Sequence, residues 1–230
     1  MNSKNKPLAI VGGAGAGLGM AIATAFANEG YQVVGLNRSL VPAVPDQIDL
    51  RQIDCTDPVA LKQCMQDVVT AYGSPAVYVH NPAELVMESF AQISAEQYEA
   101  VWRSMAFSAF VVMQEVVPLM LNEGQGSIIV SGATANIKGG ARFYAFASAK
   151  FALRGLVQSI AREYQSSRIH AVHVLLDGII DTEQSRDLHG TDPAQMMKPS
   201  DIAAQYVQLA HQPKSVWTQE LDLRPMSEKF

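Results

Sequence analysis

A glycine-rich turn close to the start of the chain is the first feature whose residue types could do chemistry. Residues 11–19 read VGGAGAGLG; they follow an apolar stretch and open a segment with helical periodicity. Glycines in such a turn let backbone N–H groups approach a pyrophosphate, whose negative charge is favoured at a helix N-terminus. A tight strand-to-helix turn needs glycine even without a ligand, so the residues alone are weak evidence. Their place between a strand and a helix favours nucleotide binding.

The end of the second apolar stretch bears on which nucleotide would bind. This stretch runs into Asn37, Arg38 and Ser39, none of which is acidic. An acidic side chain there would accept hydrogen bonds from the ribose hydroxyls of NAD, whereas an arginine pairs with the 2′-phosphate of NADP. The alternative for Arg38 is a solvated arginine in a loop. We expect NADP(H) to be favoured, with NAD(H) as the second choice.

The elements that must position these residues alternate between apolar runs of strand length and longer segments of helical period. The expected strands cover residues 8–11, 32–36, 48–53, 76–79, 127–130, 169–176 and 220–223. The expected helices cover residues 17–29, 58–72, 95–121, 143–164 and 200–211. Fully apolar strands between helices are typical of a parallel sheet that is covered on both faces. The sequence therefore predicts a single α/β Rossmann domain over residues 1–230, a doubly wound parallel sheet with helices on both faces.

Composition and charge argue against several classes of protein. Of the 230 residues, 48% are hydrophobic and 17% are charged, which is typical of a globular domain. The net charge of −5, with acidic and basic residues mixed, argues against a nucleic-acid-binding face. We find no apolar run of membrane-spanning length and no signal-peptide core, and Cys55 and Cys64 lack partners at zinc spacing. We therefore expect a cytoplasmic protein with no metal, nucleic-acid or membrane partner.

Short motifs follow the glycine turn in a fixed order, and together they resemble the short-chain dehydrogenase/reductase family over nearly the whole chain. Gly13, Gly17 and Gly19 match the family's Gly-x-x-x-Gly-x-Gly turn, although Gly12 stands where threonine is frequent. The further matches are Asp54 after the third strand, the turn His80-Asn81-Pro82-Ala83, Pro118 near the end of the long helix, and Thr182 after Asp177-Gly178. The resemblance implies a nicotinamide cofactor and a small-molecule substrate.

The resemblance also implies cofactor contacts for particular residues. Asp54 would bind the adenine amino group, and Asn81 would lie in the turn that closes over the cofactor. Thr182 would hold the nicotinamide amide, and Lys150 would hold the ribose. Considered without the family, Asn81 is equally well a turn residue, and Asp54 a helix-capping or solvated carboxylate.

The catalytic positions that the resemblance implies are mostly apolar in this chain. The family carries Tyr-x-x-x-Lys on one helix, a serine thirteen residues before the tyrosine, and an asparagine in the long helix. Counting from Lys150 puts Phe146 at the tyrosine and Ala133 at the serine, and counting from Pro118 puts Met105 at the asparagine. Phenylalanine cannot donate a proton, and general acid catalysis contributes about 10²–10⁴-fold. We therefore expect an atypical member that turns over ordinary ketones poorly.

Other polar residues could take over part of this chemistry. Tyr144 precedes Lys150 by six positions, which places the two about 120° apart on a continuous helix, so Tyr144 could act as the acid only if the helix begins after it. A slip of one residue in the counting would bring Thr134 or Ser104 to a catalytic position. A substrate loop is expected at residues 183–198.

Two functional interpretations stay open. The first is a working oxidoreductase that transfers hydride to a substrate that needs no tyrosine acid, such as an activated double bond or an iminium ion. The second is a nucleotide-binding pseudoenzyme that acts as a redox-responsive partner or scaffold, with Met105 and Phe146 filling the pocket. We also expect a homodimer or homotetramer through the helices at 95–121 and 143–164, although part of the apolar series on the second helix should pack against the chain's own sheet.

Overall fold

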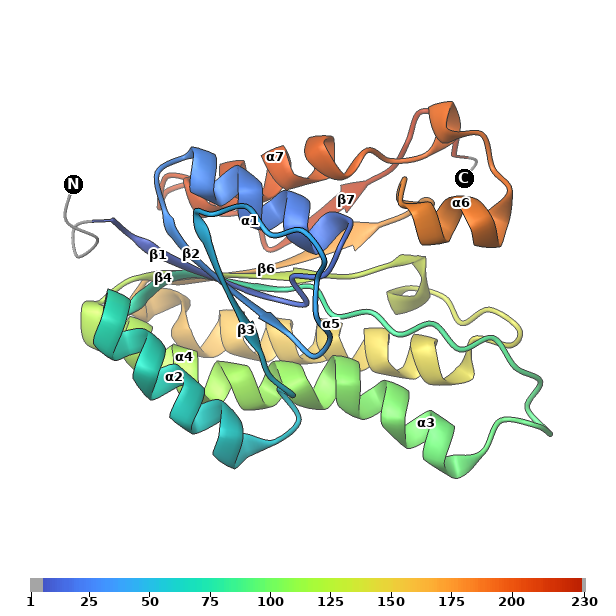
Figure 1. Cartoon of the computed structure of the whole chain (residues 1–230), viewed down its shortest axis with the longest axis horizontal. Coiled ribbons are helices and arrows are strands. Elements are labelled where there is room, and N and C mark those ends of the chain that lie inside the picture. Colours follow the sequence, from blue (N-terminus) through green and yellow to red (C-terminus); the bar gives the residue numbers. More distant parts are fainter. Residues whose placement is uncertain (1–5, 229–230) are drawn as a thin grey trace.

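The computed structural model describes residues 6–228, and a seven-stranded parallel sheet forms its centre (Figure 1). The strands are β1 (Leu8–Gly12), β2 (Gln32–Asn37), β3 (Ile48–Gln52), β4 (Pro75–His80), β5 (Gly126–Ser131), β6 (Ile169–Leu176) and β7 (Glu220–Leu223). Their order across the sheet is β3-β2-β1-β4-β5-β6-β7, with every neighbouring pair parallel. This topology confirms the predicted doubly wound α/β fold.

Helices cover both faces of this sheet. In Figure 1, α1 (Leu18–Asn28) and α7 (Pro199–Ala210) lie above the sheet, with the short helix α6 (Glu183–His189) to their right. Below the sheet lie α2 (Pro58–Tyr72), α3 (Ala95–Trp102), α4 (Ser108–Glu123) and α5 (Tyr144–Tyr164). Side chains of β1 alternate between the two layers: Leu8 and Ile10 pack with α2, α4 and α5, whereas Ala9 and Val11 pack with α1 and α7. Burial on both faces is the reason that the strands are apolar throughout.

The strand order places a ligand site at one edge of the sheet. The order reverses between β1 and β4, because β2 and β3 lie on one side of β1 while β4 to β7 lie on the other. In open α/β sheets, ligands bind outside the carboxyl ends of the strands at such a switch point. Gly13 follows β1, Arg38 follows β2 and Asn81 follows β4, so the fold gathers these residues at that edge.

Local signals in the sequence explain where several helices begin and end. The Asp57 side chain accepts a hydrogen bond from the N–H of Val59, 2.9 Å away, at the start of α2. Ser94 and Gln97 form a reciprocal capping box at the start of α3. Gly124 ends α4 in the left-handed conformation, with φ of 68°. Each residue satisfies backbone groups that a helix end leaves unpaired.

The long helix predicted over residues 95–121 is a continuous helical stretch in the structure, Ala95–Glu123, but it is not α-helical throughout. Between α3 and α4 the chain forms a π-helical turn, Arg103–Phe107. Such turns insert a residue into an α-helix and are frequent at functional sites. Nothing in the apolar periodicity of this segment distinguishes a π turn from an α turn. The insertion puts Met105, which is fully buried, at the widened turn.

The same segment corrects the expectation that no apolar run reaches membrane-spanning length. The continuous helical stretch Ala95–Glu123 is long and apolar enough to cross a membrane by length and composition. However, 56% of its apolar window is buried inside the protein, where α4 packs against α2, β4 and β5. The apolar character is therefore that of a core helix.

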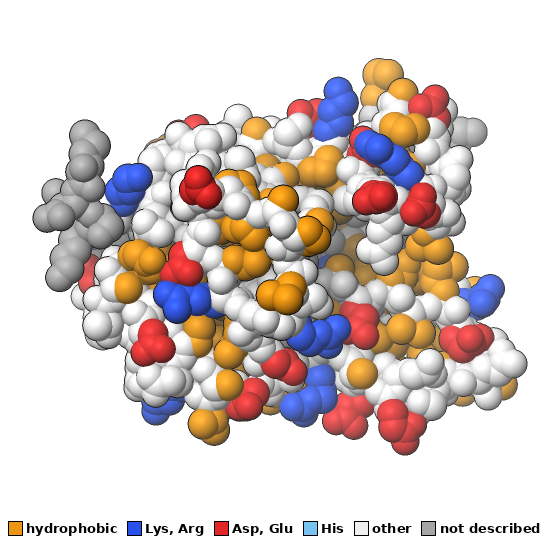
Figure 2. Space-filling model, in the orientation of Figure 1, with side chains coloured by type: hydrophobic (Ala, Val, Ile, Leu, Met, Phe, Trp, Pro, Cys, Tyr) orange, Lys and Arg blue, Asp and Glu red, His pale blue; other side chains and the backbone are white. Residues whose placement is uncertain are grey.

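On the face shown in Figure 2, acidic and basic side chains are interspersed rather than grouped by sign.

Candidate active site

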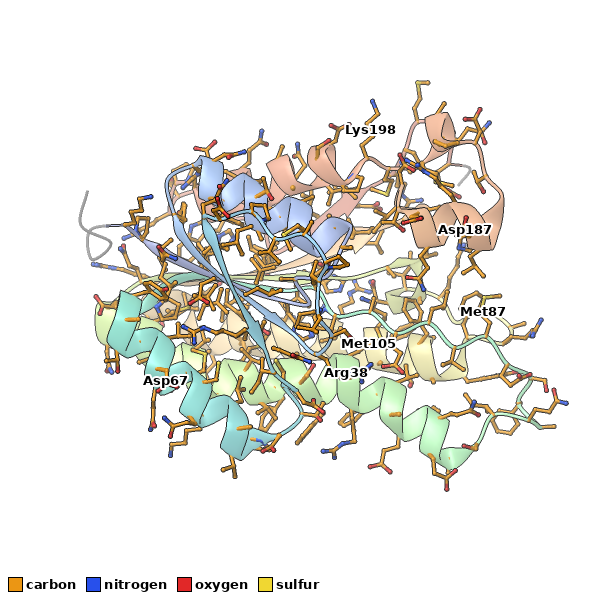
Figure 3. The ribbon with its side chains drawn as sticks, in the orientation of Figure 1. Arg38, Asp67, Met87, Met105, Asp187 and Lys198 are labelled. Atoms are coloured by element: carbon orange, nitrogen blue, oxygen red, sulfur yellow. The ribbon has the colours of Figure 1, made fainter. Side chains whose placement is uncertain are left out.

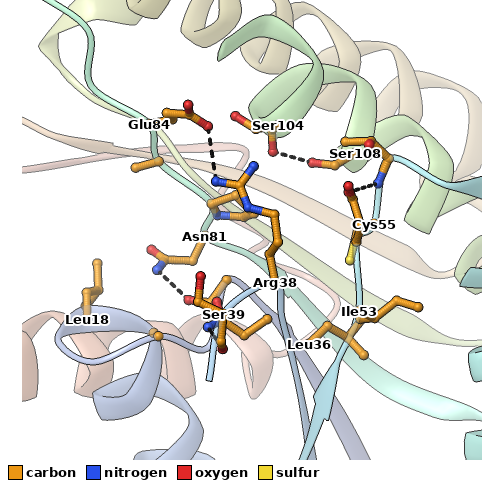
Figure 4. Close-up of a pocket in the computed structure, with 18 of the residues that line it drawn as sticks. Leu18, Leu36, Arg38, Ser39, Ile53, Cys55, Asn81, Glu84, Ser104 and Ser108 are labelled. Carbon is orange, nitrogen blue, oxygen red and sulfur yellow. Dashed lines mark hydrogen bonds and ion pairs between the residues drawn. The ribbon is translucent and has the colours of Figure 1, made fainter. Parts of the chain in front are cut away.

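A cavity of about 310 Å³ lies at the carboxyl ends of β1, β2 and β4 (Figure 4). Of the residues singled out in the sequence, Gly13, Gly19, Arg38, Asp54 and Asn81 line it. Gly13, Arg38, Asp54 and Asn81 follow four different strands and Gly19 lies in the first turn of α1, and the structure brings them around one space. Within residues 6–228, no group of three His, Cys, Asp or Glu residues is arranged to hold a metal ion.

The glycine turn has the shape of a phosphate cradle. A Cβ atom at Gly13, whose φ is +72°, would lie 2.7 Å from the backbone nitrogen of Pro82. A Cβ atom at Gly19 would lie 2.0 Å from the Gly13 carbonyl oxygen, so only glycine fits at either position. Helix α1 then begins with no side-chain hydrogen bond at its N-cap, Gly17. Its first N–H groups thus face the turn without a capping side chain, which suits an anion such as a pyrophosphate.

Gly12, which stands where the family often has threonine, lies against Tyr78 of the neighbouring strand. The hydroxyl of Tyr78 lies 3.2 Å from where a Gly12 Cβ would be. Tyr78 donates that hydroxyl to Nδ1 of His80 at 2.7 Å, and Nε2 of His80 donates to the Met105 carbonyl at 2.8 Å. A carbonyl can only accept, so His80 must carry its proton on Nε2. Complete burial lowers the pKa of His80 to about 3, which keeps the ring neutral.

A chain of hydrogen bonds joins Lys150 to the glycine turn. Nζ of Lys150 donates to the Ser131 carbonyl at 2.9 Å, and the Ser131 hydroxyl donates to Oδ1 of Asn81 at 2.8 Å. Nδ2 of Asn81 in turn reaches the Gly13 carbonyl at 3.5 Å. Burial lowers the pKa of the Lys150 ammonium to about 8. Ser131 was not predicted as a site residue, and its only signal is a hydroxyl at the end of an apolar strand.

The three catalytic positions that the resemblance implies are occupied by apolar residues. Met105 is buried in a cluster against which Phe146 packs. Nζ of Lys150 lies 5.6 Å from the centroid of the Phe146 ring. Ala133 sits just beyond β5 in extended backbone and offers only a methyl group. No side-chain hydroxyl or amide is therefore supplied at positions 105, 133 and 146.

Tyr144 and Thr134, the two substitutes considered from the sequence, both have other partners. Tyr144 is the first residue of α5, so the helix does not begin after it, and its ring packs edge-on against Phe90 at 5.1 Å. Thr134 donates its hydroxyl to Asp177. Asp177 also pairs with Nη1 of Arg224 at 2.7 Å. This polar group ties the segment after β5 to the ends of β6 and β7.

Thr182 contacts the glycine turn at Gly17, whereas Asp54 lines the cavity. Thr182 accepts a hydrogen bond from the N–H of Ser185 and caps α6, and its Cγ2 would lie 2.8 Å from a Cβ at Gly17. The N–H of Thr56 donates to Asp54 at 2.8 Å and holds the pKa of that carboxyl below its usual value.

The predicted substrate loop, residues 183–198, contains α6 and a 3₁₀ turn. In Figure 2 a recess lies beneath the lobe that carries α6, and hydrophobic side chains are exposed there.

Glu84 is a further lining residue that the sequence reasoning missed. Its carboxylate lies 3.7 Å from Nη2 of Arg38 across the cavity. Its backbone N–H points to Sδ of Met105 at 3.4 Å. Figure 3 shows Arg38 and Met105 at the same end of the sheet. The available signal was a single acidic residue three positions after Asn81, which gives no hint of its partner.

Comparison with known proteins agrees with this geometry. The sequence model of the family described as short chain dehydrogenase matches residues 7–192. The chain belongs to the short-chain dehydrogenase family. A short-chain dehydrogenase from Rhodopseudomonas palustris is similar over 96% of this chain and 99% of its own, with a TM-score of 0.81 and 33% sequence identity.

Other similar proteins are more distant in sequence. The 3-oxoacyl-[acyl-carrier-protein] reductase FabG of Escherichia coli (strain K12) is 27% identical over 194 residues, which are 82% of this chain and 79% of that protein. An alcohol dehydrogenase from the archaeon Thermococcus sibiricus, solved with 5-hydroxy-NADP, has a TM-score of 0.84 at 20% identity and covers 98% of this chain and 99% of its own. The latter likeness shows the fold. Membership of the short-chain dehydrogenase family supports the oxidoreductase class rather than the pseudoenzyme alternative.

Proposed function

We propose that this short-chain dehydrogenase is an NADP(H)-dependent oxidoreductase of the cytoplasm whose small-molecule substrate needs no tyrosine acid. The observation that carries the proposal is a contrast between the two sides of the site. The cofactor side keeps a connected set of hydrogen bonds from Lys150 through Ser131 and Asn81 to the glycine turn. The substrate side has only apolar groups at the three replaced catalytic positions.

The residues fit a nicotinamide dinucleotide, which supplies a hydride when bound. Gly13, Gly17 and Gly19 would receive the pyrophosphate at the start of α1, because their backbones leave room for close approach. Further along the cofactor, the proposed contacts are Arg38 with the 2′-phosphate, Asp54 with the adenine, Asn81 and Lys150 with the riboses, and Thr182 with the nicotinamide amide. The positions of Arg38, Asp54 and Asn81 around one cavity support this assignment.

The apolar side of the site limits the substrate class. A ketone that accepts hydride develops an alkoxide, which needs a hydrogen-bond donor or a proton. Met105, Ala133 and Phe146 supply neither. An iminium ion becomes a neutral amine without a proton donor, and an activated double bond can take its proton later from water. We therefore propose one of these two classes, with Lys150 orienting the cofactor.

Calorimetry and isotope transfer test this proposal together. NADPH should bind with a defined stoichiometry and more tightly than NADH. With NADPH deuterated at the transferable position, a panel of enones and cyclic iminium ions should give products that carry deuterium, as measured by mass spectrometry. Binding of NADPH with no deuterium transfer to any member of either class would contradict the proposed chemistry. Absence of NADPH binding would contradict the cofactor assignment.

We also propose a homodimer or homotetramer through the helices below the sheet. The apolar series on α5 supports this less than expected, because Leu153, Val157 and Ile160 are buried in the chain's own core. Two other aromatic residues support it: Phe110 on α4 is 44% exposed and Phe151 on α5 is 46% exposed. Exposed aromatic side chains of this size are enriched where proteins associate.

A further inference from the structure

Arg38, which the proposed function assigns to the 2′-phosphate, already has a partner inside the cofactor cavity. Oε2 of Glu84 lies 3.7 Å from Nη2 of Arg38, and both side chains line the same space (Figure 4). Arg38 follows β2, whereas Glu84 belongs to the loop after β4. The ion pair therefore crosses the cavity between two elements.

The Glu84 carboxylate is carried on a loop that is fixed at two points. At one end, the N–H of Asn81 donates to the Gly12 carbonyl at 3.0 Å. At the other end, the N–H of Glu84 contacts Sδ of Met105, a side chain with no exposed surface. The backbone of Glu84 is thus anchored to the buried Met105, and its side chain is directed across the cavity towards Arg38.

We propose that Glu84 is a specificity-determining residue, which competes with the 2′-phosphate for Arg38 and so limits the preference for NADP(H) over NAD(H). The inference rests on the proposed function, in that the cavity must take a nicotinamide dinucleotide. A phosphate offers Arg38 short bidentate hydrogen bonds, which are stronger than an ion pair at 3.7 Å whose side chains are 66% and 34% exposed. The phosphate therefore displaces Glu84, and only NADP(H) bears the cost of breaking the pair.

NAD(H) has no 2′-phosphate, so it leaves the ion pair in place. The other carboxylate that lines the cavity, Asp54, is occupied by the N–H of Thr56. Removing the charge of Glu84 should consequently favour ligands with a 2′-phosphate and leave the others unchanged. Removing the charge of Asp54 should not have this selective effect.

The test is calorimetry on Glu84→Gln with adenosine 2′,5′-bisphosphate and with 5′-AMP, which differ only in the 2′-phosphate. We expect Glu84→Gln to bind the bisphosphate about two- to fivefold more tightly, the range for a partly exposed ion pair, with 5′-AMP unchanged. The gain should shrink as salt is raised. Glu88→Gln is the matched control, because it removes the same charge from the same loop outside the cavity lining; it should change neither affinity.

A double-mutant cycle separates competition for Arg38 from direct repulsion of the phosphate. In the Arg38→Ala background, Glu84→Gln should increase the affinity for the bisphosphate by less than half as much, measured as the change in log Kd. The reason is that Glu84 then has no arginine with which to form an ion pair. An equal gain in both backgrounds, an unchanged bisphosphate affinity, or weaker binding of 5′-AMP would each overturn the inference. If neither nucleotide binds any variant or the unmodified protein, the proposed function fails instead.

Discussion

His80 donates from Nε2 to the carbonyl oxygen of Met105, 2.8 Å away, and so joins the loop after β4 to the π-helical turn between α3 and α4. The same ring accepts the Tyr78 hydroxyl at Nδ1, so both nitrogens are satisfied only in the neutral form. The loop that begins at His80 carries Asn81 and Glu84, both of which line the cofactor cavity. One buried imidazole thus couples the position of this loop to the long helix.

The buried histidines predict a loss of stability in acid. Burial lowers the pKa of His80 to about 3, whereas the unfolded chain binds a proton near pH 6.5. Below pH 6.5 the unfolded state holds more protons, so the free energy of unfolding falls as pH decreases towards 3. His173, whose pKa burial lowers to about 4, acts in the same direction. His80 alone should account for roughly 3 kcal/mol at pH 4, measured by urea unfolding across this range.

His80→Asn provides the internal check on this acid sensitivity. The variant loses a hydrogen-bond partner at every pH, but its stability should fall less steeply between pH 6.5 and 4 than that of the unmodified protein. His189→Asn, on the exposed end of α6, is the matched control and should leave the slope unchanged. Equal slopes for the unmodified protein and His80→Asn would show that His80 is not the titrating group.

The fold could be predicted from the sequence because its signals are local and repeated. Apolar strands between helical segments indicate a sheet buried on both faces, and the glycine turn indicates the strand–helix junction at β1 and α1. The π-helical turn could not be predicted, because the apolar periodicity is the same for both helix types and its contact with His80 joins residues twenty-five positions apart. The ion pair of Arg38 and Glu84 could not be predicted either, because in the sequence each is an ordinary charged residue. The pair forms only when the fold brings the segments after β2 and β4 to one edge of the sheet.

The buried ammonium of Lys150 lowers the stability of the fold at neutral pH. Its ammonium has a pKa of about 8 because it is buried, against about 10.5 in the unfolded chain, which corresponds to roughly 3 kcal/mol of lost stability at neutral pH. Between pH 8 and 10.5 the unfolded state holds more protons, so the free energy of unfolding should rise with pH. Lys150→Met removes the buried charge but leaves the Ser131 carbonyl without this donor. We expect it to be more stable by about 1–2 kcal/mol at pH 7, and to bind NADPH more weakly.

Urea unfolding at pH 7 and at pH 9.5 tests this expectation for Lys150→Met, with calorimetry for NADPH. The stability difference from the unmodified protein should narrow at the higher pH, because the native amine is then neutral. Lys198→Met, at the exposed start of α7, is the control. Its difference in free energy of unfolding from the unmodified protein should be the same at pH 7 and at pH 9.5. A less stable Lys150→Met at neutral pH would refute the argument from burial.

Self-association can be tested through the exposed aromatic residues of α4 and α5. Light scattering at micromolar concentration should give the mass of a dimer or tetramer. Phe151→Glu should shift the mass towards that of the 24.9 kDa monomer, because a carboxylate in an apolar interface loses its hydration without gaining a partner. Phe90 is exposed in the loop before α3, and Phe90→Glu should leave the mass of the assembly unchanged. A monomer mass for the unmodified protein would refute the proposed assembly.

Positions 133 and 146 carry no hydroxyl group, and substitution can restore one at each. Aldehydes and ketones should cause little oxidation of bound NADPH, because no hydroxyl stands at position 133 or 146 to stabilise an alkoxide. Phe146→Tyr places a phenol on the ring that packs beside Lys150, and Ala133→Ser supplies the second donor. Together they should raise carbonyl reduction by about 10²-fold or more, and each alone should do much less, since such groups act as a unit. NADPH affinity should stay constant, because the contacts of Lys150 with Ser131 and of Asn81 with Gly13 are untouched. Rapid reduction of a simple ketone by the unmodified protein would contradict this account and make Tyr144, followed by Thr134, the first residue to substitute.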